Sequence, residues 1–273
     1  MIKTFFARTF AATAVIAAAG AVAVLAEPAA APPPDAVKEL APTGKLRAAI
    51  NTGNTVLVQK DAAGGVHGIT VDLARELGRR LGMPADFVIF DAAGKVTEAL
   101  KTGVWDIAFV AIEPKRSEGI GFTAPYLVIV GTYMVSKTSP LKTIDDVDHD
   151  GIRIAVAKGS AYDLYLTRTL VHATLVRYPT PPAALDGFIA DKIDAAAGVK
   201  QPLVEFAKMH PDFRVMDGHF QEIRQAMGTP LGRDAGLQYL KTFVEEMKAS
   251  GFVRSSLDRA GQADAIVAPP AEK

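Results

Sequence analysis

The chain has 273 residues, of which 49% are apolar, enough for one large domain or two smaller ones. Its 30 lysines and arginines balance 30 aspartates and glutamates, so no basic field exists to attract nucleic acid or an anionic membrane. The absence of cysteine excludes disulfides, thiolate metal sites and a lipid-modified N-terminal cysteine. The five histidines are scattered without metal-site spacing, so no metal or cofactor is predicted.

The first 26 residues have the pattern of an export signal. Lys3 and Arg8 precede an almost uncharged apolar run at 10–25 that ends in small residues. This order is typical of a secretory signal peptide, here cleaved after Ala26, and predicts a periplasmic protein. The alternative is a membrane anchor, for which this alanine-rich run is marginal, since a span needs roughly 20 strongly apolar residues.

Both flanks of the folded part differ from it in composition. Residues 27–43 are rich in proline and alanine, which predicts an extended linker outside the fold. Residues 262–273 are expected to form a flexible tail.

Strands and helices are predicted to alternate through residues 44–261. Short apolar runs indicate strands at 46–50, 87–90, 105–111, 152–157, 175–178, 193–197, 213–216 and 224–230. Helical spacing of apolar residues indicates helices at 69–81, 95–101, 161–170, 183–190 and 234–249. The alternation is typical of an α/β fold in which parallel-rich sheets carry helices on both faces.

A similar sequence pattern occurs twice along the chain. The stretch "GKLRAAINTGN" at 44–54 is echoed by "GIRIAVAKGSA" at 151–161, and "ALKTGVWDIAF" by "FIADKIDAAAG". We therefore expect one lobe from 44–130, a second from 131–225 and a return to the first over 226–261. The chain would then cross between the lobes twice, near 130–132 and 226–228, and two such crossings form a hinge.

An arginine follows one of the predicted buried strands. Ligands of doubly wound sheets bind beyond the carboxyl ends of the strands, and Arg116 lies just past the strand at 105–111. A guanidinium can clamp a carboxylate with two parallel hydrogen bonds and stays charged, so Arg116 is the first candidate for a binding residue. The alternative is an ion pair with Glu113 or Glu118.

Five motifs in order make residues 44–260 resemble the type II periplasmic solute-binding proteins of amino-acid ABC importers, solute-binding protein family 3. They are "GVHGITVDLARELGRRLGM", "LKTGVWD", "EPKRSEGIGFTAPY", "AKGSAYD" and "ADKIDAAAG". The resemblance implies two hinged lobes that close on a small solute, and a monomer that delivers this solute to an inner-membrane ABC permease.

The resemblance also implies roles for individual residues. Arg116 matches the arginine that grips the ligand carboxylate, and the loop of Gly159, Ser160 and Ala161 matches one whose backbone N–H groups bind the same carboxylate. The remaining matches are Asn51 and Asn54 in the wall of the first lobe and Ala93 at the pocket floor. Asp72 and Asp106 belong to the motifs but are expected to serve structure.

Three departures from the family pattern concern the ligand. Ala111 and Ile112 stand where hydroxyl residues commonly bind it, and Asn51 replaces a frequent aspartate. Val199, with Lys200 beside it, stands where many amino-acid binders place an acid for the ligand's ammonium. A buried ammonium without an anionic partner is costly, so an ordinary amino acid is less favoured than the fold suggests.

The expected ligand is therefore a small carboxylate or a modified amino acid. Arg116 would hold its carboxylate, and Lys158 or Lys200 would hold a second anionic group unless these lysines are ordinary surface residues.

The alternative function is an exported enzyme on the same scaffold, because cyclohexadienyl dehydratases, which act on prephenate or arogenate, resemble these binders. Such chemistry needs a general acid, and Glu113 is the candidate unless it serves a helix start or pairs with Lys115.

Overall fold

The structure is a computed structural model that describes Met1 and residues 31–272. The predicted signal peptide, apart from Met1, lies outside these residues. The chain divides into two units, residues 1–30 and 31–273, and the second holds the fold considered below. No helix within the described residues has the length and apolarity needed to cross a membrane.

Ten strands form one hydrogen-bonded sheet. Its central order is β4 (Ala85–Phe90), β1 (Leu46–Asn51), β5 (Ile107–Ala111), β11 (Gln221–Pro230), β6 (Ile120–Ser136), β9 (Ala195–Val199), β7 (Arg153–Ala157) and β8 (Thr174–Tyr178). Two short strands, β10 (Phe213–Val215) and β12 (Ile266–Val267), also pair with β6, whereas β2 (Gln59–Lys60) and β3 (Val66–His67) form a separate hairpin.

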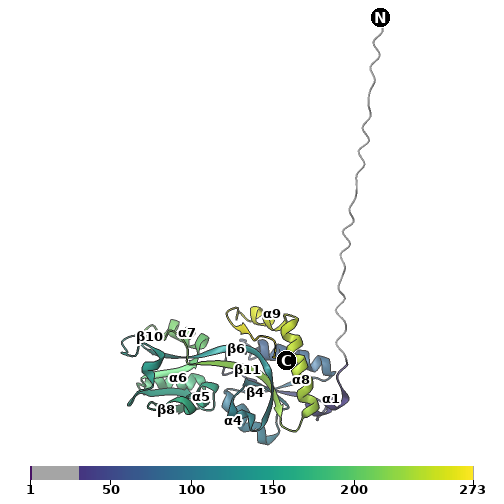
Figure 1. Cartoon of the computed structure of the whole chain (residues 1–273), viewed down its shortest axis with the longest axis horizontal. Coiled ribbons are helices and arrows are strands. Elements are labelled where there is room, and N and C mark those ends of the chain that lie inside the picture. The colour runs from purple at the N-terminus through teal and green to yellow at the C-terminus, as the bar shows by residue number, and fades with distance from the viewer. Residues whose placement is uncertain (2–30, 273) are drawn as a thin grey trace. The chain divides into compact units, whose positions relative to one another are not determined.

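The sheet has two parallel halves joined by an antiparallel centre. In the first half β1 pairs in parallel with β4 and β5, and in the second half β7 pairs in parallel with β8 and β9. The long strands β6 and β11 pair antiparallel with each other and run side by side between the halves (Figure 1). The fold class is thus the predicted α/β arrangement, with the two parallel-rich parts united in one mixed sheet.

Helices cover the sheet on both faces. Those of the first half and of the chain's return to it are α1 (Pro34–Leu40), α2 (Ile69–Leu81), α3 (Ala93–Glu98), α4 (Pro114–Ser117), α8 (Asp234–Ala249) and α9 (Phe252–Arg259), with the 3-10 turn η1 (Ala99–Thr102). Between β6 and β11 in sequence lie α5 (Ala161–Thr169), α6 (Pro181–Ala190), α7 (Lys200–Met209) and the 3-10 turn η2 (Ile144–Val147).

The helix α2 shows why the periodicity predicted helices well. Ile69, Leu73, Leu77 and Leu81 recur at helical spacing, and all four are buried. The helix ends at Gly82, whose φ of 66° is the left-handed conformation that glycine adopts most readily.

The prediction of an extended linker over residues 27–43 is wrong for its described part. Residues 34–40 form α1, with Pro34 in the first turn, where a missing N–H costs nothing. Ala36 and Leu40, one helical turn apart, are both fully buried. The Glu39 carboxylate accepts a hydrogen bond of 2.7 Å from the backbone N–H of Gly236 in α8. The apolar pair and this bond attach the segment to the fold.

The prediction of a flexible tail over residues 262–273 is also wrong where the structure describes it. The strand β12 pairs antiparallel with β6, and the Ala268 N–H donates to the Tyr126 carbonyl at 3.1 Å. Ala265 and Ala268, on either side of β12, are 3% exposed. The tail satisfies backbone groups of β6 and buries small apolar side chains, so it is part of the sheet.

Asp106 ties the returning chain to the first half. Its carboxylate is fully buried and accepts hydrogen bonds of 2.8 Å from Arg47 in β1 and 3.0 Å from Arg233 before α8. Two guanidinium partners offset the cost of burying this charge.

Candidate functional site

A cavity with a volume of ≈ 70 Å³ lies where loops and strand ends of both halves meet. Nine of the eleven residues predicted for the site line it, namely Asn51, Asn54, Ala93, Ala111, Arg116, Lys158, Ser160, Ala161 and Val199. These residues lie at or just after the carboxyl ends of strands, where ligands of α/β sheets bind. Gly159 and Lys200 do not line it.

Arg116, in the short helix α4 after β5, is the buried cation of this cavity. It is 4% exposed, and its Nη1 donates to the Ala111 carbonyl at 2.9 Å. Its Nη2 donates to the Gly159 carbonyl, also at 2.9 Å, so the guanidinium joins the two halves. Its Nε is buried without a partner. Burial lowers the pKa of Arg116 to about 10, so the side chain stays charged at neutral pH.

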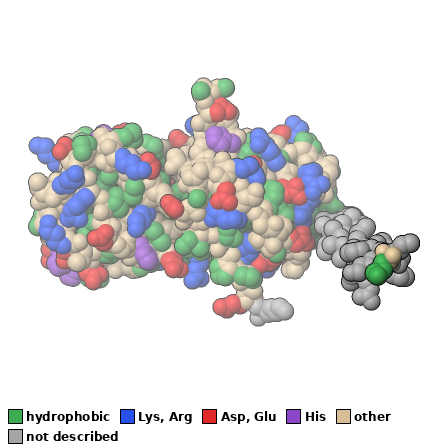
Figure 2. Space-filling view, turned by 90° about the horizontal axis from the view of Figure 1, so that it is seen from above, with side chains coloured by type: hydrophobic (Ala, Val, Ile, Leu, Met, Phe, Trp, Pro, Cys, Tyr) green, Lys and Arg blue, Asp and Glu red, His purple; other side chains and the backbone are tan. Residues whose placement is uncertain are grey.

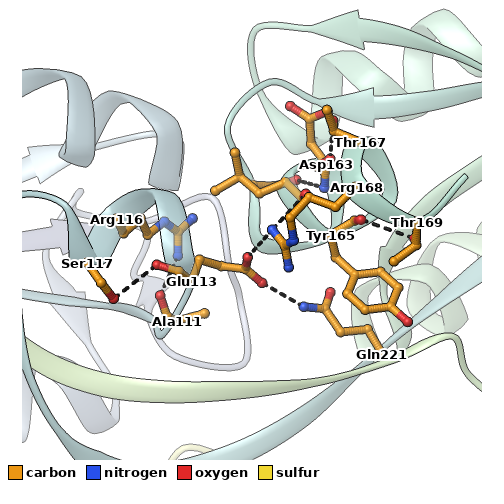
Figure 3. A network of polar contacts seen from close by, with 12 residues as sticks. Ala111, Glu113, Arg116, Ser117, Asp163, Tyr165, Thr167, Arg168, Thr169 and Gln221 are labelled. Atoms are coloured by element: carbon orange, nitrogen blue, oxygen red, sulfur yellow. Dashed lines mark hydrogen bonds and ion pairs between the residues drawn. The ribbon is translucent and has the colours of Figure 1, made fainter.

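No carboxylate among the described residues forms an ion pair with Arg116, which was the alternative to a binding role. Glu118 pairs instead with Lys115 at the surface, at 2.7 Å. Glu113 is 2% exposed, and its carboxylate accepts hydrogen bonds of 2.6 Å from Arg168 in α5 and 2.8 Å from Gln221 in β11 (Figure 3). Arg116 therefore has no direct ion-pair partner among the described residues, although the nearby charge of Glu113 raises its pKa against the effect of burial.

Glu113 was the candidate general acid of the enzyme alternative. Its two oxygens are held by Arg168 and Gln221, and it is not among the residues that line the cavity. A carboxylate committed in this way contacts the opposite half of the protein and not the space that a substrate would fill.

In the loop before α5, predicted to present its backbone N–H groups to the ligand, the N–H groups of Gly159 and Ser160 already have partners within the protein. The Gly159 N–H donates to the Asp163 carboxylate at 2.8 Å, and the Ser160 N–H donates to the Ala157 carbonyl at 3.1 Å. The Ser160 hydroxyl caps α5 by accepting from the Asp163 N–H. Asp163 therefore takes one donor of the loop, and Gly159 contributes its carbonyl to Arg116 instead.

The two lysines occupy different surroundings. Lys158 lines the cavity at its rim, where it pairs with Glu98 at 3.5 Å, and both side chains are largely exposed. Lys200 is the first residue of α7 and is exposed. Of the two, only Lys158 is placed to meet a ligand.

The side-chain oxygens of Asn51 and Asn54 each accept a hydrogen bond from a nearby backbone N–H group. The Asn51 Oδ1 accepts from the Gly53 N–H at 3.0 Å, and the Asn54 Oδ1 accepts from the Val56 N–H at 3.1 Å. Such local bonds are typical of asparagine in turns. They leave the amide NH₂ groups as the donors of this wall.

The sequence prediction missed Gln225, which lines the cavity from β11 and is 5% exposed. Its Oε1 is buried without a partner. The register of β11 against β6 shifts beside Gln225, close to Pro125, and such bulges can redirect a side chain. A polar residue inside the predicted strand at 224–230 was the available signal.

The two halves touch backbone to backbone beside the cavity. A Cβ added to Gly94 in α3 would lie 2.4 Å from the Lys158 carbonyl oxygen, and one added to Gly159 would lie 2.7 Å from the Gly94 Cα. Real Cβ atoms do not approach so closely, so both glycines are required for this contact. Gly159 also has a φ of 71°, which disfavours other residues.

On the face seen in Figure 2, acidic and basic side chains are interspersed, and neither forms a large patch of one charge. Within the described residues, no group of three or more histidine or acidic side chains could hold a metal ion.

Several solved structures share this fold. The mutant arginine-binding protein ArgBP of T. maritima is 22% identical over 83% of this chain and 99% of its own, with a TM-score of 0.72. The solute receptor for L-cysteine of Neisseria gonorrhoeae is 21% identical over 82% and 92%, with a TM-score of 0.72. The ancestral amino-acid-binding protein AncCDT-1, described as a precursor of cyclohexadienyl dehydratase, is 22% identical over 82% and 98%, with a TM-score of 0.69.

At these identities the likeness establishes the fold alone, which is that of type II periplasmic binding proteins. Family assignment comes from the sequence profile of the bacterial extracellular solute-binding proteins, family 3, which matches residues 46–261 and so covers most of the chain. The chain belongs to the bacterial extracellular solute-binding proteins, family 3.

Proposed function

We propose that the protein is the periplasmic receptor of an ABC importer and captures a small carboxylate-bearing solute between the two halves of its sheet. The observation that supports this most is the buried guanidinium of Arg116 in the cavity wall, which has no direct ion-pair partner among the described residues. A carboxylate would complete its hydrogen bonding and offset its charge in a site that water reaches poorly. Delivery to an inner-membrane permease follows as the receptor's task.

Capture would proceed by closure of two lobes, residues 44–130 with 226–261 and residues 131–225, about β6 and β11. Two contacts between the halves support this proposal: Arg116 donates to the Gly159 carbonyl, and Arg168 donates to the Glu113 carboxylate. A solute that contacts both lobes stabilises the closed form, since it binds that form better than an open one.

The dehydratase alternative has less support. Its only candidate acid, Glu113, is engaged by Arg168 and Gln221 outside the cavity lining. Incubation with prephenate or arogenate, followed by detection of an aromatic product, separates an enzyme from a receptor.

The test of the proposal is calorimetric titration of the mature protein with a panel of small carboxylates, repeated with Arg116→Met. We expect binding to the native protein and a loss of roughly 100-fold or more in the variant, because truncating one partner of a buried charge pair costs about 3 kcal/mol or more. Lys115→Met is the matched control: Lys115 precedes Arg116 in α4, but it is exposed, pairs with Glu118 and does not line the cavity, so its effect should stay within a few-fold. Equal losses in the two variants, or none in Arg116→Met, would refute the role of Arg116.

A further inference from the structure

Two charged side chains line the cavity, and both are cations. They are Arg116 and Lys158, and no aspartate or glutamate is among the lining residues. A solute inside the cavity therefore meets positive charge from the protein and no negative side chain.

Two buried acids close in sequence to lining residues, Glu113 and Asp163, are already engaged. Glu113 accepts hydrogen bonds from Arg168 and Gln221, and Asp163 accepts one of 2.9 Å from Arg177. Both acids are buried, and rotation toward the cavity would leave their partners unpaired. Neither can serve a ligand cation without dismantling these contacts.

The hydrogen-bonding groups of the wall are mostly donors. A guanidinium has five N–H groups, of which Arg116 uses two on backbone carbonyls. The side-chain oxygens of Asn51 and Asn54 each already accept one backbone hydrogen bond; these neutral oxygens cannot offset a ligand charge, and the NH₂ groups remain as donors. Gln225 offers an unpartnered oxygen, but this neutral acceptor can hold a hydroxyl or an N–H group without offsetting a charge.

The rest of the wall is apolar and the space is small. Phe109, Val110, Leu203 and Ile223 are among the lining residues. A buried water needs roughly 10 to 15 Å³ of such space, so the ≈ 70 Å³ of this cavity corresponds to a solute of few non-hydrogen atoms.

We propose that the cavity selects a small monocarboxylate that carries no ammonium group. The carboxylate lies on Arg116 and forms a neutral pair with it, the short apolar body contacts Phe109 and Ile223, and an uncharged polar substituent can reach Gln225. A zwitterionic amino acid of the same size leaves one buried positive charge without a partner, and binds more weakly for that reason. This inference rests on the proposed function, because it takes Arg116 as the carboxylate anchor.

The test uses ligand pairs that differ only in the ammonium group: propanoate against L-alanine, and 3-methylbutanoate against L-valine. Titration calorimetry at neutral pH should give a dissociation constant at least tenfold lower for the acid in the better-binding pair. Equal or tighter binding of the amino acid, or binding of none of the four, overturns the inference. If the amino acid binds and Arg116→Met abolishes its binding, the selectivity is refuted while the receptor function stands; binding that is indifferent to Arg116→Met refutes the function itself.

A second arm changes the cavity instead of the ligand. Val199 lines the cavity and is the N-cap of α7, where aspartate and asparagine are both favoured caps. Val199→Asp should move the propanoate to L-alanine preference at least tenfold toward L-alanine, because it supplies the missing negative charge. The isosteric Val199→Asn should leave the preference unchanged within about threefold. An equal shift in both variants would contradict the charge argument.

Discussion

The contact of Glu113 with Arg168 is expected to hold the closed form. Glu113 follows β5 in the first half and Arg168 lies in α5 of the second half, and the two are joined at 2.6 Å (Figure 3). In an open form Glu113 would face water. Replacing Arg168 with glutamine should therefore weaken closure more than it weakens the fold.

The magnitude follows from the burial of the two side chains. The Glu113 side chain is 3% exposed, and hydrogen bonds to charged groups contribute about 1.5–3 kcal/mol. The Arg168 side chain is 41% exposed, so solvent screening reduces the gain, and Gln221 still serves the other carboxylate oxygen. We expect a cost of about 1–2 kcal/mol in the closed form, which is roughly a 5- to 30-fold rise in the dissociation constant of the solute.

The measurement is titration calorimetry of Arg168→Gln with whichever carboxylate binds the native protein. Urea unfolding followed by the fluorescence of Trp105, the single tryptophan and a buried one, checks that the fold is retained. Lys115→Gln is the control, because it removes the Lys115–Glu118 pair, whose side chains are 71% and 64% exposed. A dissociation constant within twofold of the native value in Arg168→Gln, or the same rise in Lys115→Gln, would refute the reasoning.

Three further results are expected. Gly94→Ala should raise the dissociation constant of the solute at least tenfold with little change in urea stability, because the added Cβ would meet the Lys158 carbonyl only when the halves are closed. An unchanged affinity would contradict a contact that belongs to the closed form. Leu40→Ala should lower the free energy of unfolding by about 2–5 kcal/mol in urea titrations, since this fully buried side chain packs on Gly236; a neutral change would show that α1 is dispensable. Carboxylate affinity should be level from neutral pH to about pH 9, because the pKa of Arg116 is about 10 in the described conformation and is higher wherever water reaches the guanidinium, so the residue stays charged; a fall in affinity over this range in calorimetry would contradict the role of Arg116.

Local patterns in the sequence predicted the elements that carry a regular apolar spacing of their own. The stripe of α2 and the boundaries of α8 follow from apolar spacing, and Asp234–Ala249 is the predicted helix residue for residue. Arg116 could be chosen because a charged residue just past a buried strand stands at the edge where ligands of α/β sheets bind. These inferences needed no knowledge of distant contacts.

The elements that were missed depend on partners far away in the sequence. The helix α1 is held by Gly236 and by Leu40 burial, and β12 is held by pairing with β6. The proline-rich composition of residues 27–43 led to the prediction of an extended linker, because composition does not register such distant contacts. The same holds for Gln225, which reaches the cavity through a bulge in β11, and for the Gly159 N–H, which Asp163 occupies.

In the proposed receptor, the position of Arg116 would couple solute binding to closure. Its guanidinium donates to Ala111 of its own half and to Gly159 of the other, so closing of the halves would bury it. Burial lowers its pKa well below that of a free arginine, to about 10, which at about 1.4 kcal/mol for each pKa unit is a penalty of roughly 3 kcal/mol on the charged form. An anion that pairs with the guanidinium removes this penalty only in the closed form, because an open form leaves the charge to water. A difference of roughly 3 kcal/mol changes a closed-to-open ratio about 150-fold, a large part of what moves a receptor from mostly open to mostly closed. Under this proposal, one residue would both select a carboxylate and make closure depend on the presence of that carboxylate.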